Sequence, residues 1–442
     1  MLVVRDGGDA DLVIRGARVL DPTEGLDAHL DVRIEDGMVA EIAPEARGEA
    51  RRELDGTGLL LAPAFVDPHV HLRTPGREDE ETIASGTKAA AAGGYCAVLA
   101  MPNTDPVVDS AATLGALIET ARREAEVQVG FLAAITRGQR GQELTEMAEL
   151  SEAGAVAFSD DGVPVSSAGM MRRALQYASI TGRPLALHCE EPTLSHGGQV
   201  HEGSVAAELG FAGYPSVAES IAVERDLALA AYETQPIHLL HLSAAESVAA
   251  LRRARAAGVA ASGEVTPHHL VLTDDAVRSL DPNVKMNPPL RSAADRAELV
   301  EALRDGTIEA VATDHAPHAS HEKDVPFEAA PFGVTGLETA FAALYSHLVL
   351  PGLLPLATLL ERMSAGPARI FGIDRPRIAV GARANLVLLD LERQWRVGEE
   401  PFRSRSSNSW LLGTTLTGGV TLTVAAGAVA YEHGRVLEGA AL

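Results

Sequence analysis

Two histidines at alternate positions, His69 and His71, are residues whose types and spacing could support chemistry. They follow an apolar run at residues 59–62, which is typical of a buried strand. Side chains alternate between the two faces of a strand, so both imidazoles are predicted to project from the same face. Neutral imidazole can bind zinc, iron, nickel or copper. The pair therefore predicts part of a metal site, provided that other segments supply further ligands.

Further strand-like segments end in residues that could complete such a site. Their polar ends are Asp160 and Asp161 after residues 156–159, His188 after 184–187, His241 after 236–240, and Asp314 after 308–313. If these segments are neighbouring strands of a barrel, their carboxyl ends meet at one rim. The recurrence at five strand ends favours a shared metal site over isolated core histidines.

Several neighbouring residues have weaker assignments. Adjacent residues of a strand face opposite ways, so only one of Asp160 and Asp161 can enter the site, and the other is expected to cap the turn at Gly162. His238 faces away from His241 and is predicted to be structural. His268 and His269 could lie behind the ligands or simply pack, and the acidic runs at 78–81 and 190–191 are predicted to be solvated faces.

The elements that must position these residues alternate between strands and helices. Strands are expected at residues 59–62, 95–100, 128–135, 156–159, 184–188, 236–242, 259–265 and 308–313, and helices at 79–92, 143–152, 168–180, 216–232 and 244–256. Eight such repeats over roughly 250 residues are typical of a (β/α)8 TIM barrel, in which active sites lie at the carboxyl ends of the strands. A doubly wound open sheet is the alternative, but no G-x-G-x-x-G motif opens the first unit.

Both ends of the chain show a different pattern, with short alternating strands separated by glycine or proline turns. They are expected at residues 11–15, 17–20, 31–34 and 38–42, and again at 384–389 and 420–424. Each set is too small to bury a core alone. The sequence therefore predicts an α/β protein with two domains: a TIM barrel at residues 61–370, and a small discontinuous β-sandwich formed by residues 1–60 and 371–442.

The composition favours a soluble cytoplasmic protein. The chain has 61 acidic and 37 basic residues, and this negative charge argues against a nucleic-acid or membrane-binding surface. Its two cysteines, Cys96 and Cys189, lie in separate apolar runs, as is typical of thiols in a reducing cytosol. The N-terminus lacks the pattern of a signal peptide, and the apolar run near residues 348–360 is interrupted by prolines, so no membrane span is expected.

Five motifs of the chain resemble, in the same order, motifs of the amidohydrolase superfamily. They are FVDPHVHLR at residues 65–73, MPNT at 101–104, FSDDG at 158–162, LHCE at 187–190 and ATDHAPH at 312–318. More narrowly, they resemble the bacterial type I dihydroorotases. The resemblance extends over nearly the whole chain, including the flanking β segments.

The resemblance implies a cofactor of two Zn²⁺ ions per subunit. By that comparison His69, His71 and Asp314 hold one ion, His188 and His241 hold the other, and Asp161 bridges both. Many relatives bridge their metals with a carboxylated lysine, but no lysine occurs here between Lys88 and Lys285, so the bridge is expected to be an aspartate. Positions that match substrate contacts are His71, Arg73, Asn103, Asn287, His318, Phe332 and Gly333.

The implied activity is that of a dihydroorotase: reversible cyclisation of N-carbamoyl-L-aspartate to (S)-dihydroorotate with loss of water, in de novo pyrimidine (UMP) biosynthesis. In the hydrolytic direction Asp314 would take the proton of the attacking hydroxide and pass it to the departing nitrogen. The family also implies a homodimer and a complex with aspartate carbamoyltransferase. Two alternatives stay open: a related cyclic-amide hydrolase, such as a dihydropyrimidinase or allantoinase, and a non-catalytic paralogue that scaffolds aspartate carbamoyltransferase.

Overall fold

Parallel strands separated by helices form the central part of the chain in this computed structural model, which describes residues 1–48 and 50–433. One parallel sheet has the order β6 (Phe65–Val70), β7 (Tyr95–Ala100) and β8 (Gln128–Phe131). A second has the order β14 (Ala310–Val311), β13 (Ala261–Val265), β12 (Ile237–Leu239) and β9 (Leu185–Leu187). Strands β6 and β7 are buried along their whole length, as expected where both faces of a parallel sheet are covered.

Isolated parallel bridges connect these two sheets. Phe158 pairs with Ala133 beyond β8 and with Leu185 of β9, while Val70 of β6 pairs with His315 beyond β14. The two sheets are therefore joined by parallel pairing at both of their edges. The strand predicted at residues 156–159 is reduced to the bridge at Phe158, because the chain enters a turn at residues 161–162 soon afterwards.

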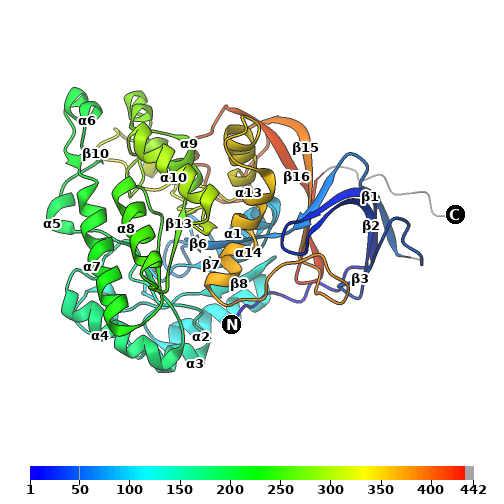
Figure 1. Cartoon of the computed structure of the whole chain (residues 1–442), viewed down its shortest axis with the longest axis horizontal. Helices are drawn as coiled ribbons and strands as arrows, with labels where there is room; N and C mark the ends of the chain where they lie inside the picture. The colour runs from blue at the N-terminus through cyan, green and yellow to red at the C-terminus, as the bar shows by residue number, and fades with distance from the viewer. Residues whose placement is uncertain (49, 434–442) are drawn as a thin grey trace.

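Helices follow most of these strands along the chain (Figure 1). The longer ones are α1 (Ile83–Ala92), α2 (Ala111–Glu124), α3 (Met147–Ala153), α4 (Ala168–Thr181), α7 (Val217–Glu233), α8 (Ala245–Ala256), α10 (Ala293–Asp305) and α13 (Leu356–Met363). The shorter ones are α5 (Pro192–Ser195), α6 (Ser204–Leu209), α9 (Pro267–Val271), α11 (Ser320–Lys323), α12 (Ala340–Leu344) and α14 (Ala365–Ile370). In residues 1–48 and 50–433, no helix has both the length and the apolar character needed to cross a membrane.

The first of these helices starts later than predicted. Helix α1 begins after Thr82 and not at residue 79, because Thr82 and Ser85 form a capping box that satisfies the free N–H groups of the first turn. Residues 73–82 are therefore a loop that runs from the end of β6 to the helix.

Strands from both ends of the chain meet in a separate eight-stranded sheet. Its order is β17 (Ala428–Glu432), β16 (Thr415–Ala425), β15 (Leu386–Arg396), β5 (Leu60–Pro63), β1 (Leu12–Asp21), β2 (Leu26–Glu35) and β3 (Met38–Ala43), with β4 (Arg52–Asp55) paired to β1. The antiparallel pair of β5 and β15 joins the two ends, and Figure 1 shows blue and orange-red strands together at one end of the molecule. Residue 49 and residues 434–442 of the predicted segments lie outside the described residues.

The apolar run at residues 59–62 does not lead directly to His69, contrary to the sequence prediction. It contains most of β5 and belongs to the eight-stranded sheet. The chain changes sheets at one residue: the Ala64 N–H donates to the Asn385 carbonyl beside β15, and the Phe65 N–H donates to the Gly94 carbonyl beside β7. The strand that carries His69 is therefore β6, which begins only at Phe65.

The sheet itself also differs from the prediction. The strands expected at residues 11–15 and 17–20 are one strand, β1, with a bulge between Ile14 and Ala17. Where a sandwich would have two separate sheets, the structure has one continuous hydrogen-bonded sheet. It has its own apolar core, which includes Ile14, Ile34, Leu61, Leu388 and Val424.

Candidate metal centre

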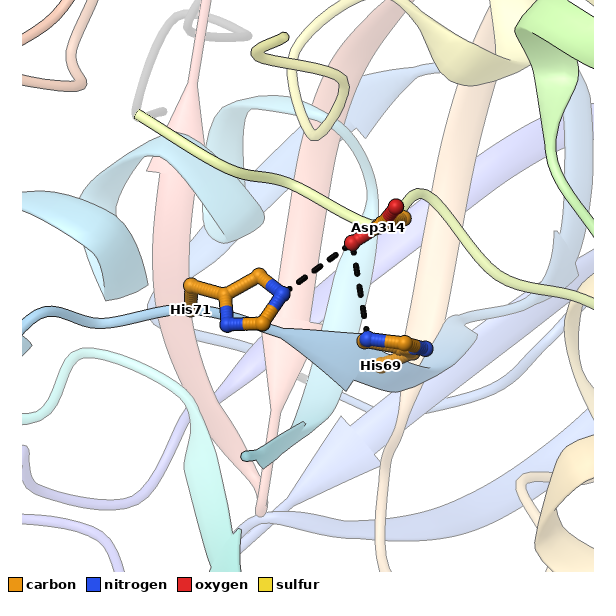
Figure 2. Close-up of side chains that lie close together, drawn as sticks. All are labelled: His69, His71 and Asp314. Atoms are coloured by element: carbon orange, nitrogen blue, oxygen red, sulfur yellow. Dashed lines mark hydrogen bonds and ion pairs between the residues drawn. The ribbon is translucent and has the colours of Figure 1, made fainter. Parts of the chain in front are cut away.

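Six buried side chains converge at the carboxyl ends of the parallel strands: His69, His71, Asp161, His188, His241 and Asp314. Oδ1 of Asp314 lies 3.4 Å from Nε2 of His69 and 3.1 Å from Nε2 of His71 (Figure 2). The two histidines face the same way because they are two positions apart at the end of β6. Asp314 reaches them because the segment after β14 is bridged to β6.

Asp161 lies between the two pairs of histidines. Its Oδ2 is 3.6 Å from Nε2 of both His69 and His71. Its Oδ1 is 3.7 Å from Nδ1 of His188 and 3.5 Å from Nε2 of His241. One carboxylate oxygen thus faces each pair, which is the arrangement required of a ligand shared by two cations.

The hydrogen bonding of His69 supports a cation at this position. Its Nδ1 lies 2.8 Å from Oε1 of Glu264, and since a carboxylate only accepts, Nδ1 carries the proton. Its Nε2 is buried, has no hydrogen-bond partner among residues 1–48 and 50–433, and faces the carboxylates of Asp161 and Asp314. A neutral ring would direct a lone pair at these carboxylates, which is unfavourable unless a proton or a metal cation lies between them. Histidine nitrogens and carboxylate oxygens are the donors that suit zinc.

The electrostatics of the cluster also favour added positive charge. Burial alone would raise the pKa of Asp161, but His69 and His241 hold it well below its usual range. The pKa of Asp314 is likewise lowered against the effect of burial, chiefly by His69 and His71. Burial would lower the pKa of His69, but the two carboxylates raise it well above its usual range.

Three residues at these strand ends have left-handed backbone conformations. The φ angles are 55° for Arg73, 29° for His241 and 48° for Asp314. A non-glycine residue in this region costs about 1–3 kcal/mol, and such strain clusters at functional sites. The His241 N–H donates a hydrogen bond to Oε1 of Glu264 at 3.3 Å, which helps to hold the backbone of His241 in this conformation.

Glu264, on β13, is a residue that sequence reasoning missed. Its fully buried carboxylate lies 2.8 Å from Nδ1 of His69 and 2.9 Å from Nε2 of His238. A carboxylate on the far nitrogen of a metal-binding histidine fixes the ring orientation and strengthens the ligand. The sequence does contain a sign of this role, because Glu264 is an acidic residue inside a predicted apolar strand, where a buried charge needs a partner. His238 contacts Glu264 behind the site, as expected for a structural residue.

The prediction that Glu190 belongs to a solvated face is wrong. Its Oε2 lies 2.9 Å from Nε2 of His188 and accepts a hydrogen bond from Nδ2 of Asn287 at 3.3 Å. Burial would raise the pKa of Glu190, but His188 is the main group that lowers it, to about 2. The side chain thus ties a candidate metal ligand to a candidate substrate contact. Its neighbour Glu191 caps α5.

The prediction for residues 78–81 is also wrong in part, because Glu80 and Glu81 are buried while Glu78 and Asp79 are exposed. Oε2 of Glu81 lies 3.1 Å from Nε2 of His315, the residue after Asp314. The second half of this acidic run therefore lies against the site.

Asp161, and not Asp160, is the aspartate that enters the site. Asp160 does not cap the turn at Gly162 through its side chain as expected. Its carboxylate accepts hydrogen bonds from the N–H groups of Ile135 at 2.8 Å and Thr136 at 3.1 Å. It therefore anchors the segment that follows β8.

His268 and His269 are both buried. Nδ1 of His269 lies 2.7 Å from Oγ1 of Thr266, and its Nε2 lies 3.0 Å from the Pro288 carbonyl. Burial lowers the pKa of His269 to about 3, so the ring is neutral. These contacts favour packing over a role beside the metal ligands, and they hold the turn next to Asn287.

A cavity of about 390 Å³ opens beside the cluster. It is lined by Asp161, His188, His241 and Asp314, and by six of the candidate substrate contacts: His71, Arg73, Asn103, Asn287, Phe332 and Gly333. The seventh candidate, His318, lies behind the wall, where its Nε2 donates to the Phe332 carbonyl at 2.8 Å. Nδ1 of His71 lies 2.9 Å from Oδ1 of Asn103, which links a metal-ligand candidate to the cavity wall.

Comparisons with curated proteins show close relatives over nearly the full length of the chain. A family model described as Dihydro-orotase-like matches residues 58–247. The chain is 46% identical over 423 residues to a dihydroorotase of Citrifermentans bemidjiense, covering 96% of this chain and 100% of the relative. It is also 46% identical over 406 residues to a dihydroorotase of Geobacillus thermodenitrificans, covering 91% and 95% of the two chains.

Solved structures show the same overall architecture. An L-hydantoinase (dihydropyrimidinase) from Arthrobacter aurescens matches with a TM-score of 0.87 and 27% identity, covering 97% of each chain. A dihydropyrimidinase from Brevibacillus agri matches with a TM-score of 0.83 and 24% identity, covering 96% of this chain and 95% of its own. The second likeness is one of fold alone.

Proposed function

Since the chain belongs to the dihydroorotase family, we propose that it catalyses the zinc-dependent, reversible cyclisation of N-carbamoyl-L-aspartate to (S)-dihydroorotate with loss of water, in de novo pyrimidine (UMP) biosynthesis. The observation that carries the proposal is the convergence of four histidines and two aspartates on a cavity that also exposes an arginine. The metal-ligand candidates account for the hydrolytic chemistry, and Arg73 accounts for a substrate that bears a carboxylate.

We propose a (β/α)8 barrel as the frame of this site. Parallel pairing at both margins of the two central sheets supports a closed barrel with Phe158 in the place of the fourth strand. We propose two domains, a barrel at residues 61–370 and a smaller domain made of residues 1–60 and 371–442. The place of β5 in the smaller domain moves the first boundary to after Pro63.

Two zinc ions per subunit are the proposed cofactor. His69, His71 and Asp314 would hold one, His188 and His241 the other, and Asp161 would contact both, in keeping with the way its two oxygens face the two histidine pairs. When bound, such a pair of ions supplies hydroxide at neutral pH and polarises the carbonyl group under attack.

Asp314 is the proposed proton carrier. Its lowered pKa keeps the carboxylate ionised at neutral pH, so it is in the form that accepts a proton. It also lines the substrate cavity, where it can pass the proton to the ring nitrogen as the amide opens. In the direction of ring closure the same carboxylate returns the proton.

Arg73 is the proposed ligand of the substrate carboxylate. Its Nε donates to the Pro317 carbonyl at 3.1 Å, while its two terminal nitrogens have no hydrogen bond to any residue in 1–48 or 50–433. A guanidinium with two free terminal groups can bind a carboxylate through two charge-assisted hydrogen bonds. The other proposed substrate contacts are His71, Asn103, Asn287, His318, Phe332 and Gly333.

A related cyclic-amide hydrolase is the second candidate, because a hydantoinase structure matches this fold at 27% identity. The presence of Arg73 in the cavity favours a carboxylate-bearing ring over hydantoin or allantoin. From the family resemblance we also expect a homodimer, an association with aspartate carbamoyltransferase and a cytoplasmic location.

A comparison of ring substrates tests the proposal. We expect kcat/KM for dihydroorotate to exceed that for dihydrouracil, the same ring without the carboxylate, by about 10- to 100-fold, since a hydrogen bond to a charged group is worth roughly 1.5–3 kcal/mol. Chromatographic assay of ring opening measures both, with hydantoin and allantoin as further substrates. Preference for an uncharged ring would contradict the assignment.

A further inference from the structure

A buried acidic residue, Glu80, lies behind the wall of the substrate cavity. Only 2% of its side chain is exposed, and it belongs to the loop between β6 and α1. The loop is fixed at this point, because the Glu80 N–H donates to the Arg77 carbonyl at 2.9 Å and Oγ of Ser406 donates to the Glu80 carbonyl at 2.7 Å. The carboxylate is therefore held in place by its own backbone.

The two carboxylate oxygens of Glu80 contact two different cations. Oε2 lies 2.8 Å from Nε of Arg73, and Oε1 lies 2.8 Å from a terminal nitrogen of Arg77. Arg73 is itself mostly buried, with 16% of its side chain exposed. Burying an unpaired guanidinium is costly, and the Glu80 carboxylate is in direct contact with this one. Glu80 is thus the counter-ion that allows a charged arginine at this position.

The same carboxylate also faces His318. Oε1 of Glu80 is 3.4 Å from Nδ1 of His318, whose Nε2 donates to the Phe332 carbonyl. Phe332 and Arg73 both line the cavity. Glu80 consequently contacts one side chain of the substrate pocket directly and is connected to a second part of its wall through one imidazole.

From this geometry we propose that Glu80 is a positioning residue, which holds Arg73 in the orientation that binds the carboxylate of the ring substrate and supports the cavity wall at Phe332 through His318. The inference rests on the proposed function, because it assigns Arg73 to that carboxylate. Glu80 contacts the guanidinium at Nε, so the two terminal nitrogens are left available to a carboxylate in the cavity. Loss of the negative charge would leave Arg73 free to turn away from the cavity, while the six metal-ligand candidates would be untouched.

The test compares Glu80→Gln with wild type and with Asp79→Asn, a neighbouring change at an exposed acid that forms an ion pair with Arg77. For Glu80→Gln we expect the KM for dihydroorotate to rise at least about 10-fold, kcat to stay within about 3-fold, and zinc content to be unchanged. Turnover of dihydrouracil should be unaffected, so the preference for the carboxylate substrate should fall. Asp79→Asn should behave as wild type, and Glu80→Asp, which keeps the charge but shortens the side chain, should lie between.

Binding of orotate by calorimetry separates this inference from the proposed function. Orotate is a planar ring with the same carboxylate, and its binding requires no turnover. If wild type binds orotate but does not open dihydroorotate, the proposed function fails while Glu80 is still tested by the loss of orotate affinity. A wild-type KM and wild-type orotate affinity in both Glu80→Gln and Glu80→Asp would overturn the inference, as would a fall in kcat alone. If Glu80→Gln does not fold, the KM and the orotate affinity of Glu80→Asp test the inference.

Discussion

Replacement of Asp314 with asparagine is expected to lower kcat for dihydroorotate by at least about 10²-fold, because a general acid–base residue contributes typically 10²–10⁴-fold. Asparagine has nearly the same size but cannot take and return a proton. The carboxylate lies 3.1 Å from His71 and 3.4 Å from His69, so its loss also removes a candidate metal ligand. Steady-state kinetics in excess zinc, with the zinc content of the same sample, measures the loss from proton transfer.

The matched control for this change is Asp160→Asn, at the neighbouring buried acid that anchors residues 135–136 and does not line the cavity. We expect it to affect stability more than kcat. A variant Asp314→Asn with full zinc and an unchanged rate would assign the proton transfer to another group.

Replacement of Arg73 with methionine should raise the KM for dihydroorotate by about 10- to 100-fold, from the loss of charge-assisted hydrogen bonds worth roughly 1.5–3 kcal/mol. Methionine keeps much of the apolar stem, so the change removes chiefly the guanidinium. The effect should be seen in KM more than in kcat, because Arg73 takes no part in the proposed proton transfer. Initial rates over a range of dihydroorotate concentrations measure it.

Two further variants serve as controls for Arg73→Met. Arg73→Lys should recover only part of the affinity, since a single ammonium cannot reproduce the planar fork. Arg122→Met, at an exposed arginine of α2, should leave KM unchanged. An unaltered KM in Arg73→Met would remove the basis for a carboxylate substrate.

The convergence of the six candidate ligands can be predicted from the sequence, because it depends on local patterns. His69 and His71 share a face by strand alternation, and each further candidate directly follows a strand whose carboxyl end meets the same rim. The orienting partners are different. Glu264 contacts His69 of another strand and Glu190 contacts Asn287 of a distant loop, and only the folded chain brings these residues together.

Element boundaries were less predictable, for a physical reason. Residues 59–70 are apolar almost throughout, since β5 and β6 are both buried, and such a run has no periodicity to mark the change of sheet at Ala64. The late start of α1 was hard to find in the sequence, because its capping box pairs Thr82 with Ser85 and not with the usual glutamate or glutamine. Acidic residues just before that point suggested a solvated helix, whereas Glu80 and Glu81 fold inward to pair with Arg73 and His315.

We propose that six residues at the strand ends bind two zinc ions that are required for turnover. The most direct measurement is zinc content and dihydroorotate turnover in the same sample, before chelation, after chelation and after zinc is restored. We expect close to two zinc ions per chain, loss of turnover on their removal, and recovery when both are replaced. A metal-free preparation that still opens dihydroorotate would contradict it.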